Sequence, residues 1–194
     1  MFEKKLKLSI KTRVKIGLQI LNALSYLHSI QIWHRDVKSE NVLVTQITHG
    51  NLNVKLCDFG ISKEFSDDRK EGTEGTVPFM APEFLDSKVF TSQSEVYSFG
   101  ILLYELFYLS VGEVCQSTPY GDLLAIQILF QVVNNDLRPD LSSLKSKLNS
   151  VSPNHREALC KIVDLMKQCW NKDPELRPSI SDCIAILKAV LSSL

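Results

Sequence analysis

The stretch IWHRDVKSENVLV, residues 32–44, decides how this sequence is interpreted. It places Asp36, Lys38 and Asn41 close together, between two short segments rich in Val, Ile and Leu. A carboxylate can accept a proton, an ammonium group can contact a phosphate, and an amide oxygen can bind a hard metal ion. The stretch therefore predicts a loop that gathers groups suited to phosphate chemistry.

A second carboxylate follows further along the chain. Asp58 comes directly after a predicted strand and precedes Phe59 and Gly60, where we expect the glycine to adopt an unusual backbone angle. Two oxygen ligands from different loops, with the remaining positions left to water and phosphate, suit octahedral Mg²⁺. Asn41 and Asp58 are accordingly the predicted metal ligands.

The hydrophobic pattern around these loops is mainly helical. Apolar residues recur every three or four positions from Arg13 to His28, and the run from Val96 to Leu109 is apolar nearly all round, as expected for a central helix. Ser92 and Glu95 have the spacing of a capping box. The other predicted elements are strands at 30–33, 41–44 and 53–56, the last two forming a hairpin across a turn at 48–51, and helices at 123–133, 155–170 and 179–191.

The predicted fold class is α+β and mainly helical, a single lobe with a few short strands. Between its strands and its central helix, residues 60–82 show no sustained period, which predicts a long loop. Loops of this length without secondary structure are uncommon unless they are functional. We therefore expect this segment to bind a ligand or to move.

Composition argues against some classes of binding partner. The 194 residues carry 22 basic and 22 acidic side chains, which leaves no basic excess for binding nucleic acid, and 44% are apolar, enough for a buried core. The five cysteines are scattered without a C-x-x-C pair, which favours reduced thiols and a cytoplasmic location. No continuous apolar run predicts secretion or a membrane span. Neither nucleic acid nor a membrane is therefore an expected partner.

Five motifs, in order, resemble the signatures of eukaryotic protein kinases. They are HRDVKSEN (34–41), CDFG (57–60), GTVPFMAPE (75–83), SEVYSFGILLYEL (94–106) and DPELRPS (173–179). Their forms are most similar to the tyrosine-kinase-like group, which mostly phosphorylates serine and threonine. The resemblance covers essentially the whole chain. It implies a protein kinase domain over residues 1–194 that is limited to the C-terminal lobe, with the catalytic loop at 34–41 and the activation segment at 58–83.

The resemblance implies a role for each matching residue. Asp36 would accept the proton of the substrate hydroxyl, and Lys38 would reach the transferred phosphate. Asn41 and Asp58 would hold Mg²⁺ on the phosphates of ATP, and Leu43 would lie under the adenine ring. The implied substrate is a protein serine or threonine, with dual specificity as the alternative.

Other positions would support that site. Arg35 would pair with a phosphorylated residue of the activation segment, for which Thr73 and Ser66 are the candidates. His34 and Phe59 would stack in the hydrophobic column that marks the active arrangement.

The remaining residues have expected structural roles in the lobe. Glu83 would form a buried ion pair with Arg177. Glu95 stands where the family usually has Asp, and it either receives backbone N–H groups of the catalytic loop or only caps its helix; the residues alone leave both open. Trp33 is expected to fill the core, and Cys57 to be a small buried residue.

The small N-terminal β lobe of the family has no counterpart in this sequence. The family places a Gly-rich lid, a phosphate-binding Lys and its partner Glu before the catalytic loop. Here 33 residues precede His34, no G-x-G-x-x-G occurs, and Lys4, Lys5 and Lys7 lie in a short polar segment. Two hypotheses follow: part of an ATP-dependent serine/threonine kinase, or a catalytically inactive kinase-like binding module. We expect the 194-residue chain alone to transfer phosphate weakly or not at all.

Overall fold

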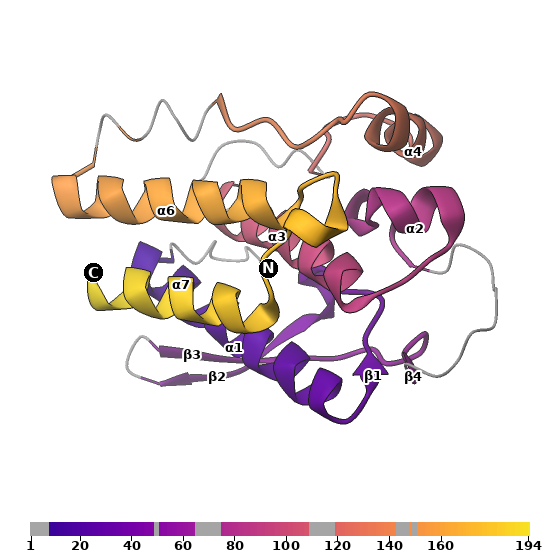
Figure 1. The fold of residues 1–194 in the computed structure, drawn as a ribbon. Helices are drawn as coiled ribbons and strands as arrows, with labels where there is room; N and C mark the ends of the chain where they lie inside the picture. Colours follow the sequence, from indigo (N-terminus) through magenta and orange to yellow (C-terminus); the bar gives the residue numbers. More distant parts are fainter. Residues whose placement is uncertain (1–7, 49–50, 65–74, 109–118, 143–147, 149–150) are drawn as a thin grey trace, which may run out of the picture.

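The fold consists of helices packed around one central helix, with two small antiparallel sheets beside them (Figure 1). The computed structural model describes residues 8–48, 51–64, 75–108, 119–142, 148 and 151–194. In chain order the elements are α1 (Ile10–Ser29), β1 (Ile32–Trp33), η1 (Ser39–Asn41), β2 (Val42–Thr48), β3 (Asn51–Leu56), β4 (Lys63–Glu64), η2 (Val77–Phe79), α2 (Pro82–Ser87), α3 (Ser92–Tyr108), α4 (Ala125–Asn134), α6 (Pro153–Cys169), η4 (Pro174–Leu176) and α7 (Ile180–Ser192). The predicted fold class is confirmed.

Helix α1 packs between the β2–β3 hairpin and α7 (Figure 1). It begins three residues before the predicted Arg13, because the Ser9 hydroxyl accepts the N–H of Thr12 at 3.1 Å and caps the first turn. Val14, Leu21 and Leu24 are fully buried on its inner face. The predicted helical periodicity is therefore confirmed.

Helix α3 forms the centre of the lobe, as predicted. Tyr97, Phe99, Ile101 and Leu103 are fully buried, so side chains on several sides of this helix are covered by other elements. It contacts α1, α6 and the short helices η1, η2 and η4. The segments that contain η1, η2 and η4 therefore all pack on the same helix.

The predicted capping box of Ser92 and Glu95 is wrong, because the cap of the helix lies one residue earlier. The hydroxyl of Thr91 accepts the N–H of Gln93 at 3.2 Å, and the hydroxyl of Ser94 accepts the N–H of Thr91 at 3.1 Å. Glu95 is fully buried and its carboxylate points into the lobe, where it has other partners.

The β2–β3 hairpin is confirmed, although both strands run further toward the turn than predicted. Val42 pairs with Leu56 at its open end. The Gln19 side chain of α1 fastens the hairpin: its amide nitrogen donates to the Leu52 carbonyl at 2.9 Å, and its amide oxygen accepts the N–H of Val54 at 2.9 Å. Polar residues extend these strands, and for that reason the apolar pattern underestimated their length.

The second sheet was not predicted. Strand β1 is shorter than the predicted 30–33, and it pairs with β4 inside the segment 60–82 that was predicted as loop; Ile32 lies opposite Glu64. The short helix η2 also belongs to that segment. A two-residue strand such as β4 has no periodicity to detect, since only its backbone pairing defines it.

The C-terminal helices begin and end within two residues of their predicted bounds. Helix α7 opens with the expected capping box: the Ser179 hydroxyl accepts the N–H of Asp182, and the Asp182 carboxylate accepts the N–H of Ser179, both at 3.1 Å. No helix in the described ranges is both long enough and apolar enough to cross a membrane. The four cysteines in those ranges are free thiols, and Cys115 lies outside them.

One glycine sets how closely α3 and α6 approach each other. A Cβ atom added at Gly100 would lie 2.7 Å from the Cβ of Cys169 and 3.5 Å from the carbonyl oxygen of Met166. Real Cβ contacts are longer, so a side chain at this position would push the two helices apart. Gly17 of α1 differs, because its added Cβ would meet only side-chain atoms, the nearest being Cδ1 of Leu187 at 3.1 Å.

We expect Gly100→Ala to destabilise the lobe by about 1–3 kcal/mol, because overpacking of a close helix contact outweighs the gain in helix propensity of about 1 kcal/mol. Gly17→Ala is the matched comparison and should cost less, because only side-chain atoms lie near its added methyl group. Urea unfolding of both variants measures the difference. Equal midpoints would show that α3 and α6 can separate without cost.

Glu105 of α3 is the buried carboxyl whose charge is least compensated among the described residues. Its side chain is 9% exposed, and Oε2 has no hydrogen-bond partner in the described part of the chain. Burial raises the pKa of Glu105 to about 7; a hydrogen bond from Ser39 acts in the opposite direction, and the nearby charge of Glu40 adds to the rise. The ionised form is therefore disfavoured in the folded state.

We expect Glu105→Gln to stabilise the lobe at pH 8 by about 2 kcal/mol, and to have little effect near pH 4. The sign follows from the raised pKa: below pH 4.5 the carboxyl is protonated in both folded and unfolded states, and above pH 7 only the folded state is penalised by its charge. Thermal unfolding of the wild type and of Glu105→Gln across this pH range measures the difference in stability. A stability gain that is equal at both pH values would contradict the burial of the charge.

Candidate active site

His34 anchors the predicted catalytic loop in the core. Its ring is fully buried, its Nε2 lies 2.9 Å from the Cys57 carbonyl, and its Nδ1 lies 3.3 Å from the N–H of Asp36. Because Nδ1 accepts, Nε2 carries the proton and donates to Cys57. The His34 ring packs on the Phe59 ring with 5.0 Å between centroids. These contacts join the two loops that begin at residues 34 and 57.

Two non-glycine residues of these loops have left-handed backbones. Arg35 has φ 69° and Asp58 has φ 65°, conformations that cost side chains about 1 kcal/mol or more. The unusual angle expected at Gly60 thus lies two residues earlier, at Asp58. Neighbouring contacts must hold both residues in place, since the backbone alone would not.

Glu95 stabilises the left-handed backbone of Arg35. Its Oε1 accepts the N–H of Arg35 at 2.7 Å, and its Oε2 lies 2.5 Å from Nε2 of His28 at the end of α1. Of the two interpretations that the residues left open, the geometry therefore supports the one in which Glu95 receives a backbone N–H of the catalytic loop. His28 was missed, because a histidine in the last turn of a helix is common and carries no motif.

Asp36 lies at the centre of a compact polar cluster. Its Oδ1 accepts the hydroxyl of Thr76 at 2.9 Å, and its Oδ2 accepts the Asn41 amide at 2.9 Å and lies 2.7 Å from Nζ of Lys38. Nζ of Lys38 also donates to the Thr76 hydroxyl at 2.7 Å. Three side chains, one of them 40 residues away in sequence, thus meet around one carboxylate.

The charge state of Asp36 follows from this cluster. Burial alone would raise its pKa, but the hydrogen bonds from Lys38, Thr76 and Asn41, together with the charge of Lys38, lower the pKa below its ordinary value. Asp36 is therefore an anion at neutral pH. Thr76 was not predicted to touch Asp36, because only the fold brings the end of the activation segment to the catalytic loop.

Asn41 and Asp58 offer oxygen atoms suited to a hard cation. The Asn41 amide nitrogen is used by Asp36, which leaves the amide oxygen as the ligand atom. Asp58 is exposed, and its Oδ1 accepts the N–H of Gly60 at 3.3 Å. Among the described residues, no group of three or more His, Cys, Asp or Glu side chains is placed to hold a metal ion by itself. One amide and one carboxylate oxygen, with other positions left to phosphate and water, fit Mg²⁺.

Arg35 presents buried donors that have no partner among the described residues. Its guanidinium group lies over the rings of Phe84 and Phe90, 5.7 and 5.6 Å from their centroids, while Nε and Nη1 make no hydrogen bond there. The predicted phosphorylation candidates Thr73 and Ser66 lie outside the described residues. The guanidinium is thus oriented by aromatic contacts and has donors available for an anion.

A bidentate ion pair fastens the end of the activation segment to the helical lobe. Nη1 and Nη2 of Arg177 donate to the two carboxylate oxygens of Glu83, each at 2.7 Å, and the Arg177 side chain is fully buried. The hydroxyl of Ser94 donates to the same carboxylate at 2.9 Å. The guanidinium also lies 5.1 Å from the Tyr97 ring centroid. The pair joins α2, α3 and the loop before α7.

Apolar side chains on the hairpin and beside it face solvent. Leu43 is 52% exposed and Val44 is 56% exposed on β2, and Phe59 is 50% exposed. Leu43 is the residue that the resemblance places under the adenine ring. Trp33, predicted to fill the core, is partly buried with its ring 5.5 Å from that of Phe90.

Comparison with known proteins agrees with this geometry. The family described as protein tyrosine and serine/threonine kinase matches residues 1–187, and the chain belongs to that family. It is 32% identical to a probable serine/threonine-protein kinase of Dictyostelium discoideum over 96% of the chain and 18% of that protein. It is 34% identical to the serine/threonine/tyrosine-protein kinase HT1 of Arabidopsis thaliana, over 93% of the chain and 40% of the relative.

A third relative is the platelet-derived growth factor receptor alpha of Xenopus laevis, 31% identical over 95% of the chain and 15% of the receptor. The chain thus spans between 15% and 40% of the length of these three relatives.

We expect Glu83→Ala to destabilise the lobe by about 3 kcal/mol, because it leaves the buried Arg177 guanidinium without its carboxylate. Glu157→Ala is the control, since Glu157 forms an exposed ion pair with Lys161 within one helix and should leave the midpoint nearly unchanged. Urea unfolding compares the two. Similar small losses of stability in both variants would show that the backbone carbonyls bonded to Arg177 are sufficient partners for its guanidinium group.

Proposed function

We propose that this chain carries the catalytic loop and activation segment of an ATP-dependent serine/threonine protein kinase. The observation that carries the proposal is the hydroxyl of Thr76, which donates to Asp36 and accepts from Lys38. A substrate hydroxyl undergoing phosphoryl transfer needs the same two neighbours, an acceptor for its proton and a cation near its oxygen. The cluster thus has the groups, spacing and charge for this reaction.

In the proposed reaction, the hydroxyl oxygen of a protein serine or threonine bonds to the γ-phosphorus of ATP. The bond between that phosphorus and the β–γ bridging oxygen breaks, and ADP leaves. Asp36 accepts the hydroxyl proton, for which its anionic state is required, and Lys38 offsets negative charge on the transferred phosphoryl group. Mg²⁺, held by Asn41 and Asp58, would neutralise charge on the nucleotide phosphates.

Positioning residues would keep this geometry. Glu95 and His34 hold the strained backbone around Arg35 and Asp36, so that the carboxylate does not have to be ordered when substrate binds. Arg35 would bind a phosphate on the activation segment through its available donors. Thr73 is the preferred site of that phosphate and Ser66 the second.

Serine/threonine specificity is supported by two features. Lys38 lies two residues after Asp36 and Thr76 follows Gly75, as in the motifs that resemble serine/threonine kinases. A hydrogen bond joins the side chains of Lys38 and Thr76. The names of the Dictyostelium and Arabidopsis relatives both include serine/threonine activity. The Arabidopsis name also includes tyrosine, which makes dual specificity the alternative.

The experiment supplies the nucleotide lid that is not found in these 194 residues. The N-terminal lobe of the Arabidopsis relative is fused ahead of the chain, and phosphate transfer from Mg-ATP to a generic basic protein is measured with phosphoamino acid analysis. We expect phosphoserine and phosphothreonine. Asp36→Asn should lower kcat by about 100- to 10,000-fold, because the proton acceptor is lost.

Asp86→Asn serves as the control, since Asp86 is an exposed aspartate of α2 away from the cluster, and it should leave kcat unchanged. Retained turnover in Asp36→Asn would contradict the role of Asp36. A fusion that folds and binds Mg-ATP but transfers no phosphate would favour the inactive binding module.

A further inference from the structure

One carboxylate holds both ends of the segment that leads from α1 into the catalytic loop. Oε2 of Glu95 lies 2.5 Å from Nε2 of His28, and Oε1 accepts the N–H of Arg35 at 2.7 Å. A carboxylate only accepts hydrogen bonds, so Nε2 of His28 is the donor. Residues 28–35 are therefore closed into a loop by a single side chain of α3.

His28 is a fixed partner for that carboxylate. It belongs to the last turn of α1, which packs between the hairpin and α7, and its side chain is only 15% exposed. Its backbone carbonyl accepts the N–H of Gln31 at 3.1 Å, where a left-handed φ of 60° turns the chain toward β1. The ring and the backbone of His28 therefore both fix the path of the chain after α1.

The ends of two helices favour this pairing. His28 lies at the C-terminal end of α1, where the helix dipole favours a cation, and Glu95 lies in the first turn of α3, where it favours an anion. Glu95 is fully buried, and a buried carboxylate oxygen without a donor is costly. Removal of the His28 ring would therefore leave Oε2 without its donor in the core.

Glu95 needs such a partner because of its length. It stands where the family usually has Asp, and glutamate has one more rotatable bond than aspartate. Each rotatable bond that must be fixed costs conformational entropy. The bond to His28 fixes the carboxylate, so that Oε1 points at the N–H of Arg35.

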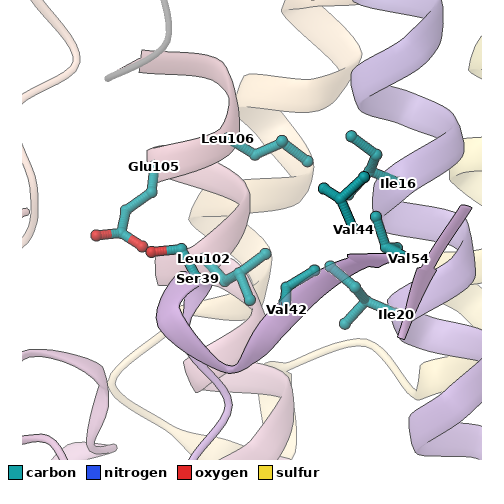
Figure 2. A pocket seen from close by; sticks show the side chains of 9 residues that line it. All are labelled: Ile16, Ile20, Ser39, Val42, Val44, Val54, Leu102, Glu105 and Leu106. Carbon is teal, nitrogen blue, oxygen red and sulfur yellow. The ribbon is translucent and has the colours of Figure 1, made fainter. Parts of the chain in front are cut away.

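The other end of the catalytic loop is attached to α3 by a different side chain. Figure 2 shows the Glu105 carboxylate next to the Ser39 side chain of η1, at the edge of an aliphatic pocket. Arg35 and Ser39 are thus joined to the same helix through separate carboxylates. A change at His28 would act on the first attachment and leave the second in place.

We propose that His28 is a positioning residue: through Glu95 it holds the backbone of Arg35, and thereby Asp36, in the geometry that phosphoryl transfer requires. Asp36 follows Arg35 directly in the chain, so a shift of the Arg35 backbone displaces the proton acceptor. The effect on turnover rests on the proposed function, whereas the effect on the Arg35 backbone does not.

The test measures amide hydrogen exchange of the 194-residue chain by NMR. In His28→Ala, exchange of the Arg35 amide should become about tenfold faster or more, because its charged acceptor is no longer fixed, and its proton signal should move upfield. The amide of Leu103, at the buried centre of α3, reports global opening and should change less.

Two further variants separate the hydrogen bond from bulk at this position. His28→Gln carries an amide nitrogen at nearly the same reach as Nε2 and should restore most of the protection of Arg35. His155→Ala, at an exposed histidine of α6, should change neither amide. Equal acceleration at Arg35 and Leu103 in His28→Ala, an unchanged Arg35 amide, or no recovery in His28→Gln would each overturn the proposal.

The consequence for turnover is measured in the fusion that carries the N-terminal lobe of the relative. His28→Ala should lower kcat by about 10- to 100-fold with a smaller change in KM for ATP, because the displaced group is the proton acceptor. An unchanged kcat would overturn the positioning role. If the wild-type fusion transfers no phosphate, the proposed function fails, and the exchange of the Arg35 amide decides the role of His28 alone.

Discussion

The hydrogen bond from the Arg35 N–H to the Glu95 carboxylate is the contact on which the rest of the site depends. It lies in the core, where a charged acceptor makes a stronger bond than it would in water. The second carboxylate oxygen bonds His28, so one side chain of the central helix fixes both the end of α1 and the start of the catalytic loop. Without it, the left-handed backbone of Arg35 would lose its hydrogen bond to the central helix.

The same organisation recurs at the other loops of the lobe. His34 links the catalytic loop to the segment at Cys57. Arg177 donates both to Glu83, at the end of the activation segment, and to the Gln93 carbonyl of α3. Each link places a buried polar group of one element on a backbone or carboxylate of another. A few hydrogen bonds therefore position the loops on the helical core, while apolar side chains supply most of the buried surface.

Much of the fold could be predicted from the sequence, because long helices have a strong period. Helices α1, α3, α6 and α7 and the hairpin were predicted with small errors at their ends, where caps such as Ser9 and Thr91 decide the boundary. Strand β4 could not be predicted, since two residues carry no pattern. The capping box at Ser92 failed because the Glu95 carboxylate is used in a tertiary contact that local spacing does not reveal.

The motif residues of the site could be located in the sequence, but their connections could not. Asp36, Lys38 and Asn41 are neighbours in the chain, so their proximity was predictable. Thr76 joins them from 40 residues away, and this contact depends on how the activation segment folds back. Glu105 shows the same limit: in sequence it is one acidic residue of an apolar helix, and only the structure shows its buried, unpartnered oxygen.

The hydroxyl of Thr76 links the geometry of a loop to the charge of a carboxylate. Its bond to Asp36 is strongest when Asp36 is ionised, and the bonds that keep Asp36 ionised include this one. By reciprocity, protonation of Asp36 weakens the attachment of the segment that begins at Gly75. The hold on the segment after Gly75 therefore depends on pH, and it weakens as Asp36 takes up a proton.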